Sequence, residues 1–265
     1  MKKIRIGGAS GYWGDSAYAT QQLLSKGDVD YLVYDYLAEV TMSLLANAKS
    51  KSDQLGYATD FVQQILKPNL KDIKERGVKV VANAGGVNLT ACKEAIQTIL
   101  DEQGIQLKIG AVSGDNLLSK EDALRASGVT EMETGAAFPA KLASINAYLG
   151  AFPIAAALDA GADIVITGRV VDSATTLGVL IHEYQWAVDD LDKLSMGSLA
   201  GHLIKCGCQV TGGNFTDWQD SCDDWADMGY PIVECQQDGE FVVTKALGTG
   251  GLVSKLTVAE QMIYE

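Results

Sequence analysis

Short apolar runs alternate with longer amphipathic stretches along the first two thirds of the chain. The short runs are rich in Val, Ile and Tyr and end in glycine or small polar residues, which is typical of strands in a parallel sheet buried on both faces. The longer stretches repeat their apolar positions with helical spacing. We expect strands at 3–8, 29–35, 78–83, 106–113 and 162–168, and helices at 15–25, 37–48, 57–76, 89–103, 140–160 and 173–185. This alternation predicts the α/β class, with a mainly parallel sheet flanked by helices in Rossmann-like layering.

The pattern changes in the last third of the chain. A predicted helix at 195–205 is followed by two strand-like runs, YPIVEC at 230–235 and EFVVTK at 240–245. The Asp238-Gly239 pair between these runs suits a tight hairpin turn. We therefore expect a β-hairpin added at one edge of the sheet.

The end of the chain has no clear stop signal. Residues 256–265 form a helical pattern without a terminal glycine, proline or basic last turn. No linker-like or repeated segment divides the sequence. We expect one α/β domain over 1–265 that is truncated at its C-terminus.

Composition narrows the range of partners. Asp and Glu number 34 against 21 Lys and Arg, and the formal charge is −13. The acids are spread along the chain, which indicates a solvated surface and argues against nucleic-acid and membrane partners. No apolar run approaches the ~18–20 residues that a membrane span needs, and we expect the five cysteines to be reduced thiols. These features predict a cytoplasmic protein.

Small polar residues follow every strand predicted in the first two thirds. The segments are GGASGYWGD, YDYLAE, NAGGVN, SGDN and TGRVVDSAT. Because the carboxyl ends of parallel strands share one edge of a sheet, these segments should meet where α/β proteins bind their ligands. Turn formation alone would explain one such loop, but five together predict a binding site.

The first of these segments has two interpretations. Gly8, Gly11 and Gly14 follow one strand and Asp35 ends the next, which is similar to a dinucleotide fingerprint. The spacing is GxxGxxG instead of GxGxxG, however, and two bulky aromatic residues stand where a pyrophosphate would approach. We favour a turn whose backbone N–H groups hold a carboxylate, a thioester oxygen or a phosphate.

Charged residues at the strand ends are candidates for the chemistry. Asp35 and Glu39 would share a helix face if a helix begins by residue 36, and could then bind a divalent cation or divide acid and base roles. Alternatively, Asp35 caps that helix and Glu39 is a favourable first-turn charge. Arg169 could clamp a carboxylate or phosphate, or it could form a structural pair with Asp172.

The remaining signals are weaker. His202 stands four residues before Cys206, which could give a reactive pair or an incomplete metal site, but the spacing fits no closed zinc motif. Thr-Gly-Gly occurs at 211–213 and at 249–251, and such turns can bring backbone close to a ligand.

These arguments define a candidate site. We expect catalytic roles for Asp35, Glu39, Arg169, Asp172 and His202. We expect substrate-binding roles for Gly8, Ser10, Gly11, Trp13, Asp15, Asn83, Gly85, Gly86, Asn88, Asp115, Thr167, Gly168, Ser173, Thr211, Gly212, Gly213, Asn214, Gly250 and Gly251. No metal ligands are assigned, and a divalent metal ion is the one cofactor left open.

Several long motifs resemble one known family. They are GGASGYWGDS, DYLAEVTMS, NAGGVN, NAYLGA, GADIVITGRVVDSA, LIHEY, GHLIKCGCQVTGGNFTDW, GYPIVE and GTGGLVSKLTVAEQ. Together they resemble the acyclic terpene utilisation protein family (AtuA-like, N-terminal domain) over essentially the whole chain. The resemblance implies a part in the bacterial breakdown of citronellol and geraniol, in which branched acids are processed as CoA thioesters. It implies no catalytic residues, and it places Lys205 where we expect an acid in many relatives.

Three hypotheses for function follow. The first is a lyase- or hydratase-type enzyme without a redox cofactor, which acts on an acyl-CoA or related hydroxy acid by hydration, dehydration or carbon–carbon cleavage. The second is a non-catalytic subunit that binds an acyl-CoA, and the third is a dinucleotide-dependent oxidoreductase. Each has a small-molecule partner, and an open sheet edge favours a homo-oligomer.

Overall fold

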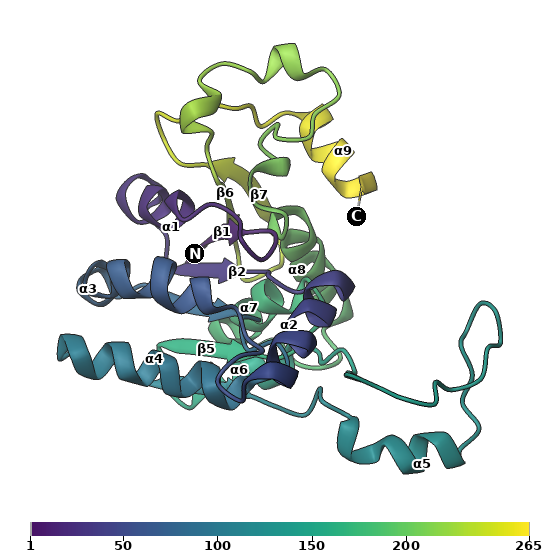
Figure 1. The fold of residues 1–265 in the computed structure, drawn as a ribbon. Helices are drawn as coiled ribbons and strands as arrows, with labels where there is room; N and C mark the ends of the chain where they lie inside the picture. Colours follow the sequence, from purple (N-terminus) through teal and green to yellow (C-terminus); the bar gives the residue numbers. More distant parts are fainter. Residues whose placement is uncertain (1, 265) are drawn as a thin grey trace.

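A seven-stranded sheet forms the centre of the structure, a computed structural model that describes residues 2–264 (Figure 1). The strand order is β4-β5-β3-β2-β1-β6-β7. The mutually parallel strands are β1 (Ile4–Ser10), β2 (Tyr31–Tyr34), β3 (Lys79–Ala82), β4 (Ile109–Val112) and β5 (Ile164–Thr167). The antiparallel strands are β6 (Pro231–Cys235) and β7 (Phe241–Lys245).

Helices connect the strands and cover both faces of the sheet. The α-helices are α1 (Tyr18–Gln22), α2 (Glu39–Lys51), α3 (Lys67–Arg76), α4 (Leu89–Gln103), α5 (Glu121–Ala126), α6 (Phe152–Asp159), α7 (Ala174–Tyr184), α8 (Leu191–Ile204) and α9 (Lys255–Tyr264). The π-helices are η1 (Leu23–Gly27) and η2 (Phe61–Leu66). The 3₁₀-helices are η3 (Leu118–Lys120), η4 (Gly207–Gln209), η5 (Trp218–Asp220) and η6 (Trp225–Asp227).

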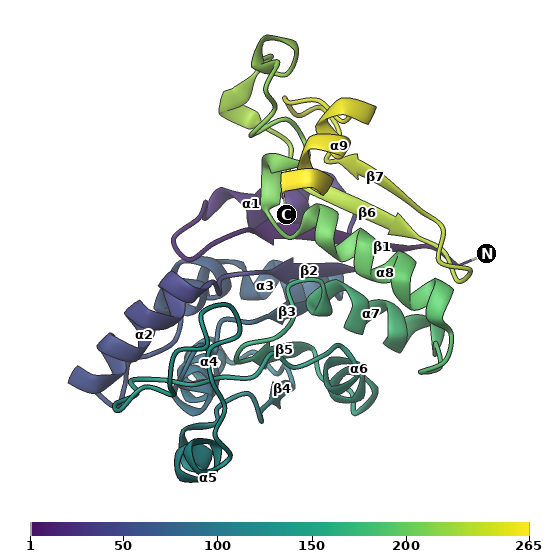
Figure 2. The ribbon, with the colours of Figure 1, turned by 90° about the vertical axis from the view of Figure 1, so that its right-hand side faces the viewer.

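Three layers result from this arrangement. Figure 2 shows α3 and α4 on one face of the sheet and α6, α7 and α8 on the other. Strand β2 explains why: Leu32 and Tyr34 pack toward α3 and α4, whereas Tyr31 and Val33 pack toward α7 and α8, and all four are buried. A strand covered on both faces is apolar at every position, which is the continuous pattern of the sequence. None of the helices within residues 2–264 is both long and apolar enough to cross a membrane.

The predicted hairpin is confirmed. Strands β6 and β7 pair antiparallel at one edge of the sheet, beside β1. Gly239 has a φ of 94°, and the backbone N–H of Glu240 donates to Oδ1 of Asp238 over 3.1 Å. Aspartate followed by glycine therefore closes the turn as its chemistry predicts.

The predicted helix at 140–160 is wrong over its first half. Helix α6 begins at Phe152, with Pro153 in its first turn, where a missing N–H is tolerated. Before it the chain is extended, because Leu149 forms a parallel bridge to Val170 and Ile145 accepts from the backbone N–H of Leu117. Pairing with distant segments overrides the local helical spacing, and it places NAYLGA beside the strand ends.

The other predicted helices and strands differ from the observed ones mainly at their ends. The predicted strand at 106–113 is shortened to β4, and the predicted helix at 15–25 begins at Tyr18 and continues as η1. Helix α5 was not predicted, since none of its residues is buried and it has no apolar face to the core.

Glycines let the end of β1 pack directly on the end of α8. A Cβ on Gly8 would collide with the carbonyl oxygen of Ile204, and one on Gly11 would lie 2.7 Å from Cα of Cys206. Since backbone atoms in a packed core cannot move aside easily, no larger residue fits there. These two glycines therefore place the α8 terminus beside the end of β1.

Replacing Gly8 by alanine should destabilise the protein. The added methyl group meets backbone instead of a flexible side chain, so we expect Gly8→Ala to lower the free energy of unfolding by about 1–3 kcal/mol. Gly150→Ala is the control, because a Cβ there has no atom within 4 Å and φ is not positive. Urea unfolding of both variants checks this, and equal stability would contradict the packing argument.

Candidate active site

A cavity of about 430 Å³ lies at the carboxyl ends of β1 and β2. Its lining comes from segments that are far apart in the sequence. The lining residues are Gly11, Tyr12, Asp35, Tyr36, Leu37, Ala38, Glu39, Arg169, Asp172, Lys205, Cys206, Gln209 and Tyr264. Four of the residues that we expected to be catalytic, Asp35, Glu39, Arg169 and Asp172, are thus brought together.

Asp35 is fixed by the neighbouring strand end. It is only 5% exposed, and its Oδ1 accepts a 2.5 Å hydrogen bond from Nδ2 of Asn83. Oδ1 of Asn83 in turn accepts from the backbone N–H of Tyr36 over 2.7 Å. These bonds keep the chain extended after β2, and α2 begins at Glu39. A helix start by residue 36, which a shared face would require, is therefore not found, and Asp35 and Glu39 do not share a helix face.

The surroundings of Asp35 tune its acidity. Burial raises its pKa to about 6, and the negative charge of Asp172 adds to the rise. The hydrogen bond from Asn83 and the positive charges of Lys205 and Arg169 act in the opposite direction. A carboxyl group with this pKa gains and loses a proton near neutral pH, as a general acid–base must.

Arg169 forms a fixed cation at the base of the cavity. It is buried, and its Nη1 donates to the carbonyl oxygen of Leu37 over 2.5 Å and to Oδ1 of Asp172 over 2.9 Å. Its Nη2 donates to the hydroxyl of Tyr148 over 3.0 Å, and its guanidinium carbon lies 4.1 Å from the centre of that ring. The hydroxyl of Tyr148 donates to Oε1 of Glu39 over 2.8 Å.

Asp172 lies between two cations. One of its carboxylate oxygens accepts from Arg169, and the other pairs with Nζ of Lys205. Both cations line the cavity, so one carboxylate partly neutralises two positive charges. Such a fixed pair can stabilise negative charge that develops on a bound molecule.

A comparison of the sequence with models of protein families finds a match that covers almost the whole chain. The family model described as "Acyclic terpene utilisation family protein AtuA" matches residues 4–265. The chain belongs to this family. The resemblance seen in the motifs is thereby confirmed, and it ties the chain to acyclic terpene utilisation. Neither the curated proteins nor the solved structures contain a significant match.

In this AtuA-family chain, backbone N–H groups of the glycine-rich turn after β1 donate to one of the protein's own carboxylates. Oδ2 of Asp15 accepts from the backbone N–H of Gly11 over 2.9 Å, and its Oδ1 accepts from that of Ser16 over 2.7 Å. The carboxylate of Asp15 therefore takes a position where we expected an external anion. Trp13 turns away and donates to Oδ1 of Asp60 over 2.7 Å.

Asp115 holds the backbone of Arg169 in place through a hydrogen bond. Its Oδ2 accepts from the backbone N–H of Arg169 over 2.9 Å and from Nδ2 of Asn146 over 2.7 Å. A Cβ on Gly168 would collide with this carboxylate, so the glycine makes room for it. Asp115 also lines a separate cavity of about 200 Å³ together with Gly86 and Asn88.

The two Thr-Gly-Gly turns pack against each other. The backbone N–H of Leu252 donates to the carbonyl oxygen of Thr211 over 2.8 Å, and a Cβ on Gly251 would lie 2.6 Å from that oxygen. Nε2 of His202 lies 3.4 Å from the carbonyl oxygen of Met262 in α9.

Most of the residues that we expected to bind substrate do not line this cavity. His202, which we expected to be catalytic, does not line it either. The binding residues outside the lining are Gly8, Ser10, Trp13, Asp15, Asn83, Gly85, Gly86, Asn88, Asp115, Thr167, Gly168, Ser173, Thr211, Gly212, Gly213, Asn214, Gly250 and Gly251.

Several residues of the site were not assigned from the sequence. Lys205, Gln209 and Tyr264 line the cavity, and Tyr148 holds Arg169. Tyr148 and Lys205 stand within the motifs NAYLGA and GHLIKCGC, which was the one available signal. Nothing in the linear pattern connects these residues with the strand ends.

The acids of the cavity do not fit a divalent cation. Within residues 2–264, no three His, Cys, Asp or Glu side chains are grouped so that they could hold a metal ion. Asp172 is paired with two cations, and Glu39 accepts from Tyr148. A cation there would have to displace these partners.

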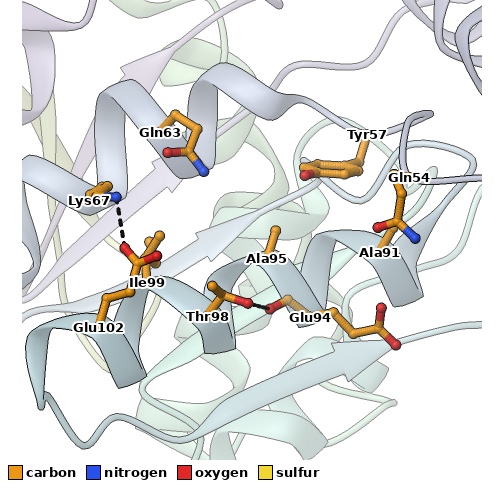
Figure 3. A pocket seen from close by; sticks show the side chains of 10 residues that line it. All are labelled: Gln54, Tyr57, Gln63, Lys67, Ala91, Glu94, Ala95, Thr98, Ile99 and Glu102. Atoms are coloured by element: carbon orange, nitrogen blue, oxygen red, sulfur yellow. Dashed lines mark hydrogen bonds and ion pairs between the residues drawn. The ribbon is translucent and has the colours of Figure 1, made fainter. Parts of the chain in front are cut away.

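A second cavity, of about 400 Å³, lies between η2 and α4 (Figure 3). Lys67 and Glu102 form an ion pair of 2.8 Å at one end, and Thr98 donates to the backbone of Glu94. It contains none of the predicted site residues. Its polar groups are partly paired with each other, and we assign it no role in the site.

The raised pKa of Asp35 predicts how stability depends on pH. The unfolded chain loses this proton near pH 4 and the folded chain near pH 6, so folding becomes less favourable as pH rises through this window. Relative to Asp35→Asn, the wild type should therefore lose about 2 kcal/mol of unfolding free energy between pH 4 and pH 7. Urea unfolding across this range measures the difference.

The exposed Asp122 provides the matched control. Asp122→Asn controls for the loss of one carboxylate from the chain. A constant difference between wild type and Asp35→Asn would contradict the raised pKa.

Proposed function

We propose that the protein is a cytoplasmic enzyme of acyclic terpene utilisation, in which Asp35 transfers a proton on a branched carboxylic acid or its thioester. The observation that carries this proposal is a buried, oriented carboxyl group beside two fixed cations in one cavity. The reaction is a hydration or dehydration, or a carbon–carbon cleavage, of an acyl-CoA or a related hydroxy acid. Neither class of reaction requires a redox cofactor.

Asp35 has the properties of a general base. Its Oδ1 is held by Asn83, so the carboxyl group keeps one orientation when a substrate binds. Its pKa of about 6 leaves it mostly ionised at pH 7, and protonation there is readily reversible. In a dehydration it would take the proton from the carbon next to the carbonyl group and return it to the departing hydroxyl group, which leaves as water.

Arg169 and Lys205 oppose the charge that this step creates. Removal of the proton places negative charge on the carboxyl or thioester oxygen of the substrate. Two cations that are already fixed by Asp172 need little reorganisation to stabilise that oxygen. The same pair would hold the carboxylate of a free acid before the reaction.

Asp35→Asn should retain substrate binding and lose turnover. The amide cannot accept the proton, so we expect kcat to fall at least 100-fold with KM changed less than threefold. Assays with branched 3-hydroxy acids, the corresponding 2,3-unsaturated acids and the CoA thioesters of both test this. The wild-type rate should fall below pH 6 as Asp35 becomes protonated.

Asp122→Asn is again the control and should keep wild-type kinetics. Full turnover by Asp35→Asn would exclude Asp35 as the base. A folded wild type that binds these thioesters without turning them over would support the accessory role, and saturable binding of NADH or NADPH alone would support the oxidoreductase.

Lys205→Met should weaken binding and shift the pH profile. Loss of a charge-assisted contact costs about 1.5–3 kcal/mol, so KM should rise at least tenfold. Lys205 also lowers the pKa of Asp35, so its removal should move the acid limb of kcat/KM to higher pH. An unchanged acid limb would contradict the coupling between these two residues.

A further inference from the structure

Glu39 lines the catalytic cavity, but the proposed reaction does not use it. Its Oε1 accepts from the hydroxyl of Tyr148 over 2.8 Å. The same oxygen lies 4.0 Å from Nη2 of Arg169, which is too long for a hydrogen bond. The side chain of Glu39 is 82% exposed and that of Arg169 is 5% exposed. An exposed carboxylate therefore lies beside a buried cation without a hydrogen bond to it.

The guanidinium of Arg169 has more donors at Nη2 than it has partners there. Nη1 donates to both Leu37 and Asp172. Nη2 also carries two N–H groups, but within residues 2–264 its one hydrogen-bond partner is the hydroxyl of Tyr148, at 3.0 Å. A buried charged group is unfavourable unless its donors are paired. The second N–H of Nη2 and the hydroxyl of Tyr148 are thus two neighbouring donors that suit the two oxygens of one carboxylate.

These donors lie where two cavities adjoin. A cavity of about 210 Å³ shares Glu39 and Arg169 with the lining of the catalytic cavity. Of the two, Tyr148 lines this second cavity, whereas Lys205 lines the catalytic one. One guanidinium therefore borders both cavities, with a hydroxyl donor on one side and a second cation on the other.

Glu39 can leave this position at little cost. An ion pair of 4.0 Å with so exposed a carboxylate contributes little to stability. A carboxylate of a ligand is not attached to α2, so it can approach Nη2 to hydrogen-bond distance. There it forms a charge-assisted bond, which is about twice as strong as a neutral one. A suitable ligand should therefore replace Glu39 at these donors.

We propose that Nη2 of Arg169 and the hydroxyl of Tyr148 form a second carboxylate-binding subsite, from which a bound substrate displaces Glu39. This inference rests on the proposed function and extends it. When the reacting carboxyl or thioester group lies beside Lys205, a second carboxylate of the same molecule reaches Tyr148 on the other side of Arg169. The substrate class is accordingly a branched dicarboxylic acid, or its thioester at one end.

The first test compares acids that differ in the second carboxylate. Isothermal titration calorimetry at constant ionic strength measures the binding of succinate, glutarate and adipate, each against the monocarboxylic acid with the same number of carbon atoms. At least one dicarboxylate should bind the wild type about tenfold or more tightly than its monocarboxylic counterpart, because a charge-assisted contact contributes that much.

Two variants then locate the subsite. Tyr148→Phe keeps the ring that lies over Arg169 and removes the hydroxyl, so the preference for the dicarboxylate should fall below about threefold. Glu39→Ala removes the competing carboxylate, so the dicarboxylate should bind about two- to fivefold more tightly. Glu75→Ala is the matched control, because Glu75 is also exposed and forms an ion pair of 3.8 Å with Lys71. It should leave both affinities unchanged.

A measurement on the wild type avoids any effect of a substitution on folding. The backbone N–H of Glu39, the hydroxyl of Tyr148 and the charge of Arg169 lower the pKa of Glu39, and Asp172 opposes them. Saturation with the tightest dicarboxylate should raise this pKa toward the usual value of a glutamate, as followed by the side-chain carboxyl resonance in ¹³C NMR. The monocarboxylic acid should leave it unchanged.

These binding tests are independent of the proposed reaction, since they require no turnover. Asp35→Asn should keep the preference for the dicarboxylate, so an intact preference without catalysis would refute the reaction alone. Equal binding of both classes of acid by the wild type, a preference that survives Tyr148→Phe, weaker dicarboxylate binding by Glu39→Ala, or an unchanged pKa of Glu39 would each overturn the subsite.

Discussion

The buried guanidinium of Arg169 is the group on which the candidate site depends. It joins the connection after β2 through Leu37, the connection after β5 through Asp172, and the extended segment before α6 through Tyr148. Because a buried guanidinium cannot lose its charge, its donors must have partners in fixed positions. Satisfying this one group therefore orders three segments that are far apart in the sequence, and the cavity lies where they meet.

The same requirement determines the chemistry of the cavity. Arg169 and Lys205 share Asp172, and Asp35 lies buried beside all three. Burial makes the charged form of Asp35 unfavourable, whereas Asn83 and the cations partly restore it. The raised pKa lowers the free energy of unfolding at neutral pH, but it gives Asp35 a carboxyl group that can exchange a proton there. Perturbed pKa values of this kind are common at active sites.

Particular residues show how far the fold could be predicted. Tyr31–Tyr34 is apolar at each position, and a buried parallel strand was the correct interpretation because both faces are covered. The pair Asp238-Gly239 correctly predicted a hairpin, since a two-residue turn depends on local backbone preferences. The helix predicted over 140–160 failed in its first half because Leu149 pairs with Val170, a contact that no local pattern contains.

The sequence by itself determined the α/β class, the family, and the gathering of Asp35, Arg169 and Asp172 at one edge. These properties follow from periodicity and from the common direction of parallel strands. Only the tertiary structure decided that Gly8 and Gly11 pack on α8, and that Tyr148 and Lys205 belong to the site. The reason is physical: spacing along a chain encodes local conformation, whereas burial, pKa and enclosure depend on distances between segments that meet only after folding.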